Sequence, residues 1–266
     1  MSADRPPRPL VLLSNDDGWT SPGLLAARDA LAKDCDVVTV APEHEQSASS
    51  HALSLRRALR LRKISEGQFA LDGTPADCVY VALHGGTRIL QRPPDLVFSG
   101  INLGLNLGQD AFYSGTIAAA REAALRGIPS IAASTSVSLD LESVASASAK
   151  VAHALLREAT AQAGRRGRAR LMSLNFPEAW NGVLRATRLG TRIYEESVDF
   201  RVDPYRREYL WLGGPGVRHD KDPGTDTDAH DEGVASITPL VLDLTCTADA
   251  ALAEAIAHEI GERPFR

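Results

Sequence analysis

The chain has 266 residues, of which 44% are hydrophobic and 24% are charged, and its formal net charge is −5. This composition is ordinary for a globular protein and too apolar for a chain that is disordered throughout. Proteins that bind nucleic acid as a polyanion are usually basic, so a nucleic-acid duplex is not an expected partner. A small anionic substrate stays open, because a bound metal ion can supply positive charge locally.

The cysteines and the N-terminal segment bear on the compartment. Cys35, Cys78 and Cys246 lie far apart and form no CxxC pair, so a cysteine zinc site is not expected. We expect all three to be buried packing residues of a reduced, cytoplasmic protein. MSADRPPRPL lacks the apolar region of a signal peptide, and no segment reaches about 18 uninterrupted apolar residues. The sequence therefore predicts neither secretion nor a membrane span.

The first elements in chain order form a β-α-β unit. The apolar run at 10–13 predicts a buried strand, which the polar residues SNDDG at 14–18 terminate. Residues 21–33 have a Ser-Pro start and apolar residues at helical spacing, and 35–42 predict a second strand. Such a unit implies a parallel sheet with a right-handed crossover.

The same alternation continues along the chain. It predicts helices at 74–83, 114–126 and 141–163, and strands at 95–98, 129–133 and 170–175. A loop rich in glycine and asparagine is expected at 99–108, and a basic solvated turn at 164–170. These elements predict a single α/β domain that spans residues 1–266.

Residues 194–233 differ from the rest, since they are polar and contain one good strand candidate, Glu208–Leu212. A plain loop of about 40 residues is improbable inside a compact domain. We interpret the segment as a hairpin-like excursion used in subunit contacts. The chain then returns at 234–245 and closes with a helix at 248–260.

Polar loops follow several of the predicted strands, where ligands bind in open α/β sheets. Asp16 and Asp17 come directly after the first buried strand, and two like charges in a poorly solvated place are costly. A hard divalent cation would offset that cost by binding both carboxylates. The alternative is a turn with an aspartate that caps the next helix.

Three further loops offer ligand atoms. Ser47 and the histidines His44 and His51 follow the second strand, and Asn102 and Asn106 lie four residues apart among glycines. The glycine-rich loop does not match the P-loop or the dinucleotide fingerprint. Ser114, Gly115 and Thr116 begin a helix, where free amides and the helix dipole favour an anion such as phosphate. Solvated loops and a simple helix cap remain the plainer interpretations. Together the loops indicate metal-assisted phosphoryl chemistry.

Several blocks in order from about residue 10 to about 245 resemble the SurE family. They are SNDDG, VVTVAPEHEQSASSHAL, GTPADCVYVAL, PDLVFSGINLGLNLGQDAFYSGTIAAAREA, GIPSIAAS and GTDTDAHDEGVASITPL. The resemblance implies a Rossmann-like, mostly parallel sheet with helices on both faces and a C-terminal extended hairpin arm. It implies a homodimer or homotetramer with divalent-metal nucleotidase activity on nucleoside 5'- and 3'-monophosphates.

The resemblance also assigns residues. It implies one cation per subunit, Mg²⁺ or Mn²⁺ with Ca²⁺ as an alternative, on Asp16, Asp17, Ser47 and Asn102. It implies phosphate contacts on Asn106, Ser114, Gly115 and Thr116, so that Asp16, Asp17, Asn106 and Ser114 are the candidate catalytic residues. All four metal ligands are oxygens, which favours a hard ion over zinc or copper.

The proton donor to the leaving group is not assigned, and His44 and His51 are the candidates. A second metal site is conceivable in the late polar segment, although an acidic, flexible loop is the preferred interpretation. Its ligands would be His219, Asp220, Asp226, Asp228, His230 and Asp231.

Other functions remain as alternatives. A phosphatase with an aspartyl nucleophile needs DxDx[TV] after the first strand, whereas this chain has Asn15-Asp16-Asp17-Gly18. Trapping a phosphoaspartate would favour that class. A non-catalytic, metal-dependent nucleotide-binding module would bind AMP without turnover. A structural subunit that assembles through 194–233 is compatible with catalysis.

Overall fold

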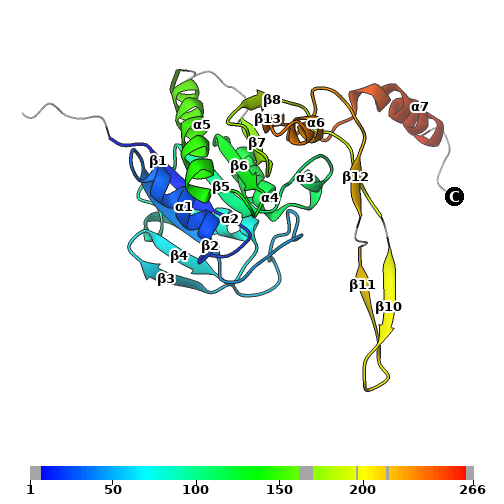
Figure 1. Cartoon of the computed structure of the whole chain (residues 1–266), viewed down its shortest axis with the longest axis horizontal. Helices are drawn as coiled ribbons and strands as arrows, with labels where there is room; N and C mark the ends of the chain where they lie inside the picture. Colours follow the sequence, from blue (N-terminus) through cyan, green and yellow to red (C-terminus); the bar gives the residue numbers. More distant parts are fainter. Residues whose placement is uncertain (1–6, 162–169, 196, 214–215, 262–266) are drawn as a thin grey trace, which may run out of the picture.

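The structure is a computed structural model that describes residues 7–161, 170–195, 197–213 and 216–261. The basic turn expected at 164–170 lies outside the described residues, apart from Arg170. A nine-stranded sheet of order β3-β4-β2-β1-β5-β6-β7-β13-β8 crosses the body (Figure 1). Its strands are β1 (Leu10–Ser14), β2 (Asp36–Pro42), β3 (Leu61–Ser65), β4 (Gln68–Leu71), β5 (Leu96–Leu103), β6 (Ser130–Thr135), β7 (Leu171–Phe176), β8 (Leu184–Ala186) and β13 (Ala235–Leu240).

The sheet is mostly parallel, as predicted. Strands β4, β2, β1, β5, β6 and β7 run parallel, while β3 and β13 run antiparallel to β4 and β7. The chain moves from β1 to β2 on one side, and β5 lies on the other side of β1. The strand order therefore reverses at β1, and a ligand site is expected beyond the carboxyl ends of β1 and β5.

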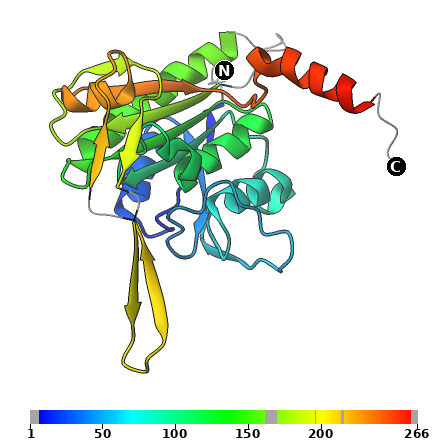
Figure 2. The ribbon, with the colours of Figure 1, turned by 90° about the vertical axis from the view of Figure 1, so that its right-hand side faces the viewer.

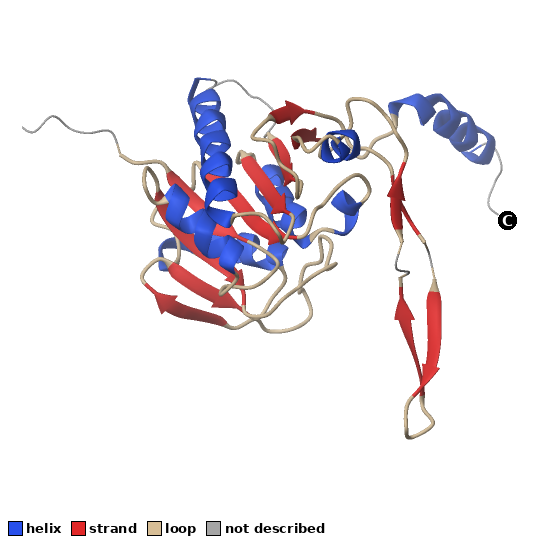
Figure 3. Ribbon diagram, in the orientation of Figure 1, coloured by secondary structure: helices blue, strands red, loops and turns tan. Residues whose placement is uncertain are grey.

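Helices cover both faces of the sheet (Figure 3). They are α1 (Pro22–Leu31), α2 (Pro75–His84), α3 (Asp110–Tyr113), α4 (Gly115–Leu125), α5 (Leu141–Ala161), α6 (Asp226–Asp231) and α7 (Ala250–Gly261), with short 3-10 turns at Gly86–Arg88 and Thr247–Asp249. Val11 and Leu13 of β1 pack under α1 and α5, whereas Leu10 and Leu12 pack under α2 and α4. Successive side chains of a strand point to opposite faces, so a strand covered on both must be apolar throughout.

Parts of the sheet differ from the prediction, and the short edge strand β8 is one that the sequence did not indicate. The loop expected at 99–108 begins late, because β5 continues to Leu103 and pairs with β6 after an irregularity between Ser99 and Asn102. The β3–β4 hairpin was not predicted, since β3 is mostly exposed and lacks an apolar run. Its turn contains Gly67, whose φ of +67° suits glycine.

The hairpin arm is present and projects from the body in both views (Figure 1, Figure 2). Strand β9 (Arg192–Tyr194) pairs with β12 (Val217–His219) at its base. Strand β10 (Val198–Val202) pairs with β11 (Glu208–Leu212) toward its tip. The sequence indicated β11 alone, because the other strands are short and polar residues interrupt them.

The segment after the arm is not the flexible acidic loop that we expected at 219–231. It contains α6, which returns to the body with Thr225, Asp226 and Thr227 fully buried. The Asp226 carboxylate accepts hydrogen bonds from the amides of Gly108, at 3.0 Å, and Gly190, at 2.7 Å. Two backbone amides thus satisfy a buried acid that the sequence alone suggested as solvated.

The expectation that all three cysteines are buried is wrong for one of them. Cys35 and Cys78 are buried free thiols, but Cys246 is exposed in the segment between β13 and α7. Helix α7 extends from the body (Figure 2), with Leu252, Ile256 and Ile260 exposed. None of the helices within the described ranges has the length and apolarity to span a bilayer.

A close approach between α1 and β5 fixes the helix that follows the Asp16–Asp17 loop. A Cβ on Gly23 would lie 1.9 Å from the Ile101 carbonyl oxygen. We predict that Gly23→Ala lowers the free energy of unfolding by about 1–3 kcal/mol, because α1 must move off β5. Gly261→Ala is the control, since that Cβ would meet no atom within 4 Å. Equal urea midpoints for both variants would contradict the close contact.

Candidate functional site

A cavity of about 700 Å³ lies beyond the carboxyl ends of β1 and β5. Six of the residues that the sequence singled out line it together: Asp16, Asp17, Ser47, Asn102, Asn106 and Ser114. The other two, Gly115 and Thr116, are buried at the start of α4. The topology therefore gathers residues from four separate loops at one edge of the sheet.

Asp16 and Asp17 leave the buried strand β1 at the floor of this cavity. Asp16 is 4% exposed and its carboxylate accepts a hydrogen bond from the Thr116 hydroxyl. Asp17 is less buried, and its carboxylate accepts from the Leu103 amide at 3.2 Å. Each acid is thus held by a different neighbour, one by α4 and the other by the end of β5.

The start of α4 packs directly against Asp16, which requires glycine at position 115. A Cβ on Gly115 would lie 2.9 Å from the Asp16 Cβ and 2.9 Å from the Ser49 hydroxyl oxygen. The Ser49 hydroxyl is itself buried and has no partner among the described residues. Because the Thr116 hydroxyl is bonded to Asp16, that side chain supports the acid rather than facing the cavity.

The electrostatics of the two acids favour a cation. Burial raises the pKa of Asp16 to about 6, opposed by the Thr116 hydrogen bond and reinforced by the charge of Asp17. Burial also raises the pKa of Asp17, and the charge of Glu45 adds to the effect. Two neighbouring carboxylates that burial makes costly to ionise are the kind of pair that a positive ion would stabilise.

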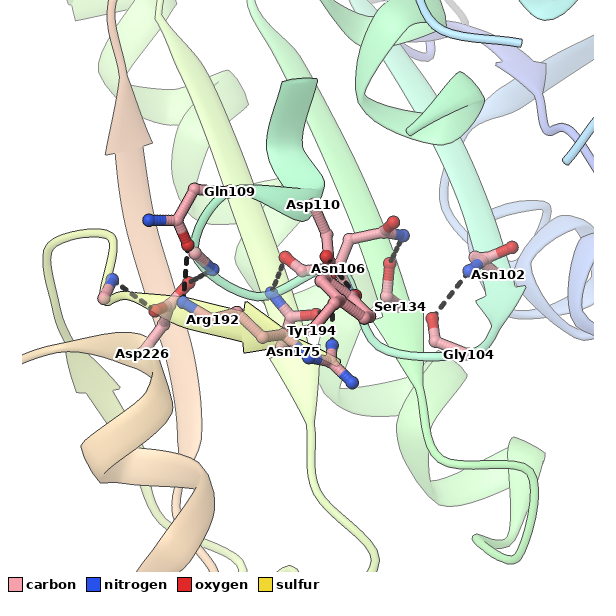
Figure 4. Close-up of polar contacts among 12 residues, drawn as sticks. Asn102, Gly104, Asn106, Gln109, Asp110, Ser134, Asn175, Arg192, Tyr194 and Asp226 are labelled. Atoms are coloured by element: carbon pink, nitrogen blue, oxygen red, sulfur yellow. Dashed lines mark hydrogen bonds and ion pairs between the residues drawn. The ribbon is translucent and has the colours of Figure 1, made fainter. Parts of the chain in front are cut away.

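Ser47 and Asn102 supply neutral oxygens at the rim. The Ser47 hydroxyl donates to Glu45 at 2.7 Å, and Ser47 is exposed. The Asn102 side-chain nitrogen donates to the Gly104 carbonyl at 2.6 Å (Figure 4). Its carboxamide oxygen is therefore the atom that Asn102 can offer to a cation. With the two acids these residues form an all-oxygen donor set, which fits a hard divalent ion.

Asn106 is fixed by the two strands beneath it (Figure 4). Its amide donates to the Asn175 side chain at 2.8 Å, and its side-chain nitrogen donates to the Ser134 hydroxyl at 2.7 Å. Asn175 returns a bond to the Asn106 carbonyl at 3.1 Å. This network holds the loop after β5 over the ends of β6 and β7.

Ser114 caps the N-terminus of α4 at the cavity wall. Its hydroxyl accepts from the Ile117 amide at 3.1 Å, so the helix-cap interpretation of this residue is confirmed. A cap does not remove the positive end of the helix dipole. The N-terminus of α4 therefore offers partial positive charge toward a phosphate in the cavity.

Sequence analysis assigned no role to several other residues that line the cavity. They are Glu45, Asp110, Tyr113, Tyr194 and Leu212, of which the last two belong to the arm. Asp110 accepts bonds from Arg192 at 2.5 Å and from the Tyr194 hydroxyl (Figure 4). No short motif marks this contact, because it joins residues more than 80 positions apart.

The histidine candidates lie away from this cavity. His51 Nε2 lies 2.8 Å from Glu122 of α4, His44 is exposed, and neither lines the cavity. In the late segment, His219, His230 and Asp231 have ligand atoms within 4.8 Å of one another. Asp226 is bonded to backbone amides instead, so the six-residue second metal site is not assembled.

A second cavity, of about 1050 Å³, lies at the opposite edge, before the strands begin. Pro9, Asp34 and Asp95 line it together with Arg92 and Arg157. Arg92 pairs with Asp95 at 2.7 Å, so the cavity contains a matched ion pair and no pair of adjacent like charges. The cavity at the carboxyl ends is the better candidate site, because its paired acids have like charge.

Comparison with known proteins finds similar chains over most of the length of this one. A family model described as "Survival protein SurE" matches residues 11–196. A protein named 5'-nucleotidase SurE from Sorangium cellulosum is 56% identical over 258 residues, covering 97% of this chain and 99% of that protein. Another of that name, from Syntrophotalea carbinolica, is 42% identical over 239 residues, covering 89% and 92%. The crystal structure of the Sure protein from Aquifex aeolicus superposes with a TM-score of 0.77 at 34% identity, covering 93% of this chain and 99% of that one.

The raised pKa of Asp16 predicts how the metal-free protein responds to pH. Because this pKa lies at about 6 in the folded protein against an ordinary 3.8, its stabilising contribution is complete below about pH 4 and lost as pH rises through 6. The full difference corresponds to about 3 kcal/mol. In EDTA, Asp16→Asn should therefore become progressively more stable than the wild type between pH 4 and pH 7.

Urea unfolding of both proteins across this pH range measures the effect. At pH 7, added Mn²⁺ should make the wild type more stable than Asp16→Asn, because the ion stabilises the folded wild type by binding it. If the difference in free energy of unfolding between the two proteins does not change with pH, ionisation of Asp16 does not destabilise the folded protein.

Proposed function

This chain belongs to the SurE family and is a 5'-nucleotidase, and we propose that it hydrolyses nucleoside monophosphates with a divalent cation held by Asp16 and Asp17. The observation that supports the cation is the pair of adjacent acids, one of them 4% exposed, at the floor of a cavity. The proposal includes 3'-monophosphates as substrates, Mg²⁺ or Mn²⁺ as the ion with Ca²⁺ as an alternative, and a cytoplasmic location. The buried free thiols of Cys35 and Cys78 fit a reducing compartment.

Ser47 and Asn102 would complete the protein ligands, since both line the cavity and offer neutral oxygens. A bound divalent cation would neutralise phosphate charge and increase the acidity of water. Asp16 is kept in position by Thr116, and Asp17 by the Leu103 amide. These bonds orient the two carboxylates before any ligand arrives, which is how a protein prearranges a charged site.

Asn106, Ser114 and the amides of Gly115 and Thr116 would bind the phosphate oxygens. The network to Ser134 and Asn175 holds Asn106 at the cavity, and the α4 N-terminus faces the same space. Donors fixed in this way stabilise the negative charge that grows as the ester bond breaks. Removing one such donor lowers kcat by about 100- to 1000-fold at comparable sites.

Two alternative functions, an aspartyl-nucleophile phosphatase and a non-catalytic binding module, predict different results. An aspartyl nucleophile must reach the phosphorus, whereas Asp16 is buried and bonded to Thr116. A binding-only module would bind AMP without releasing phosphate. Phosphate release from AMP that stops on chelation and resumes with Mn²⁺, with no trapped phosphoaspartate, separates the metal-dependent enzyme from both.

We predict that Asp16→Asn lowers kcat/KM for AMP at least about 100-fold, because the substituted amide carries no charge to hold the cation. Colorimetric phosphate release in Mn²⁺ gives the rates, and calorimetry gives the Mn²⁺ affinity, which should fall in parallel. Asp29→Asn on the exposed side of α1 is the matched control and should retain activity. Wild-type turnover by Asp16→Asn would remove this residue from the proposed role.

We further propose that residues 194–233 contribute to a homodimer or homotetramer. Alternate residues of a strand share a face, so β10 and β11 together present one apolar face to solvent. That face comprises Val198, Phe200, Val202, Leu210 and Leu212, each 47% or more exposed. A two-stranded ribbon with such a face is not stable alone in water, and a partner surface would cover it.

We predict that Phe200→Glu combined with Leu210→Glu reduces the oligomer to smaller species, because charges would replace an opposed apolar pair. Light scattering coupled to sizing chromatography measures the mass. Arg201→Glu, on the other face of β10, is the control and should keep the wild-type mass. If the double variant keeps the mass of the wild type, the arm does not join the subunits.

A further inference from the structure

The cavity is larger than a phosphate and a cation require. Its volume of about 700 Å³ lies within the range of sites that enclose whole small molecules, about 300–1000 Å³. Asp16, Asp17 and Ser114 line it together with three large side chains, Tyr113, Tyr194 and Leu212. The polar residues suit the phosphate, and the aromatic residues suit the remainder of the substrate.

Tyr194 comes from β9, at the base of the arm, and its ring is held from two directions. The hydroxyl donates to Asp110, which also accepts from Arg192 at 2.5 Å (Figure 4). The Arg192 guanidinium carbon lies 5.6 Å from the centre of the Tyr194 ring. Burial and the bond to Asp110 raise the pKa of Tyr194 to about 12, so it stays neutral. Tyr194 is nevertheless 43% exposed and lines the cavity.

Asp110 is well placed to keep this arrangement rigid. It is 9% exposed, and its backbone carbonyl accepts from the Ser114 amide at 2.9 Å. The same residue therefore contacts the start of α4 and both arm residues. The position of the Tyr194 ring is thereby fixed relative to the start of α4.

Tyr113 lies at the end of α3. It directly precedes Ser114, and its carbonyl accepts from the Ser50 amide at 3.0 Å, which anchors the backbone. Its side chain is 64% exposed and lines the same cavity. A ligand whose phosphate lies at the α4 N-terminus would extend past this ring.

We propose that Tyr113 and Tyr194 form the binding site for the nucleobase of the substrate. This inference rests on the proposed function of the site, because the phosphate must lie beside Ser114 for the base to reach both rings. Aromatic side chains bind bases by stacking on their π faces, which every base possesses. The site would accept all bases and favour the larger purines, since stacking depends on the overlapped area.

The arm therefore supplies part of the substrate site as well as an apolar face. Strand β9 and the residue at the end of β11 contribute Tyr194 and Leu212 to the cavity wall. A nucleotide without its base would lose these contacts while keeping those to the phosphate. The ratio of activity on the two substrates isolates the base site.

The test compares AMP with ribose 5-phosphate, which has the sugar and phosphate but no base. The wild type should have the higher kcat/KM for AMP. Tyr113→Ala and Tyr194→Leu should each lower the AMP to ribose 5-phosphate ratio by about 5- to 100-fold, mainly through KM. Tyr194→Phe should restore most of the ratio because it keeps the ring. Tyr205→Ala, at the exposed tip of the arm, is the control.

Equal losses on both substrates would overturn the inference, as would a wild type that does not prefer AMP. Calorimetric titration with adenosine tests the base site without any phosphate chemistry. The wild type should bind adenosine, and Tyr194→Leu should bind it at least about 5-fold more weakly. Absence of phosphate release from AMP by the wild type in Mn²⁺ would contradict the proposed function, whereas equal adenosine affinity would contradict the base site.

Discussion

Two carboxylates on consecutive residues follow a strand that is buried along its whole length, and their burial is the constraint on which the site depends. Strand β1 lies inside the sheet between β2 and β5, and its carboxyl end places Asp16 against α4 and Asp17 against β5. Burial raises the pKa of both acids, so their ionisation destabilises the metal-free folded protein. Gly115 packs closely on Asp16 and contributes to this burial.

The loop after β5 connects this centre to the rest of the molecule. Asn106 bonds to Ser134 and Asn175, the Gly108 amide donates to Asp226 of α6, and Asp110 contacts the arm. Hydrogen bonds from this one short segment therefore connect it to the sheet, to α6 and to the base of the arm. Buried polar networks of this kind fix one arrangement when every member is satisfied. The network therefore fixes the start of α4 relative to the base of the arm.

Particular residues show where the sequence was sufficient. Leu10–Leu13 predicted a buried strand because every position is apolar, and Thr74-Pro75 predicted a helix start that the capping box at Thr74 confirms. The acids, Asn102, Asn106 and Ser114 were located because short polar motifs follow strands. By contrast, β3 is mostly exposed, and Asp226 is satisfied by amides more than 30 residues away. The contact of Asp110 with Tyr194 likewise depends on tertiary packing, which local periodicity does not encode.

The presence of a cation between Asp16 and Asp17 is the claim on which the other assignments depend. Anomalous diffraction from crystals soaked in Mn²⁺ tests it most directly, because the signal locates the metal independently of the protein atoms. We expect one strong peak about 2.0–2.6 Å from oxygens of both acids, with the side-chain oxygens of Asn102 and Ser47 next to it. No peak beside these acids, together with full phosphate release from AMP after exhaustive chelation, would contradict the account.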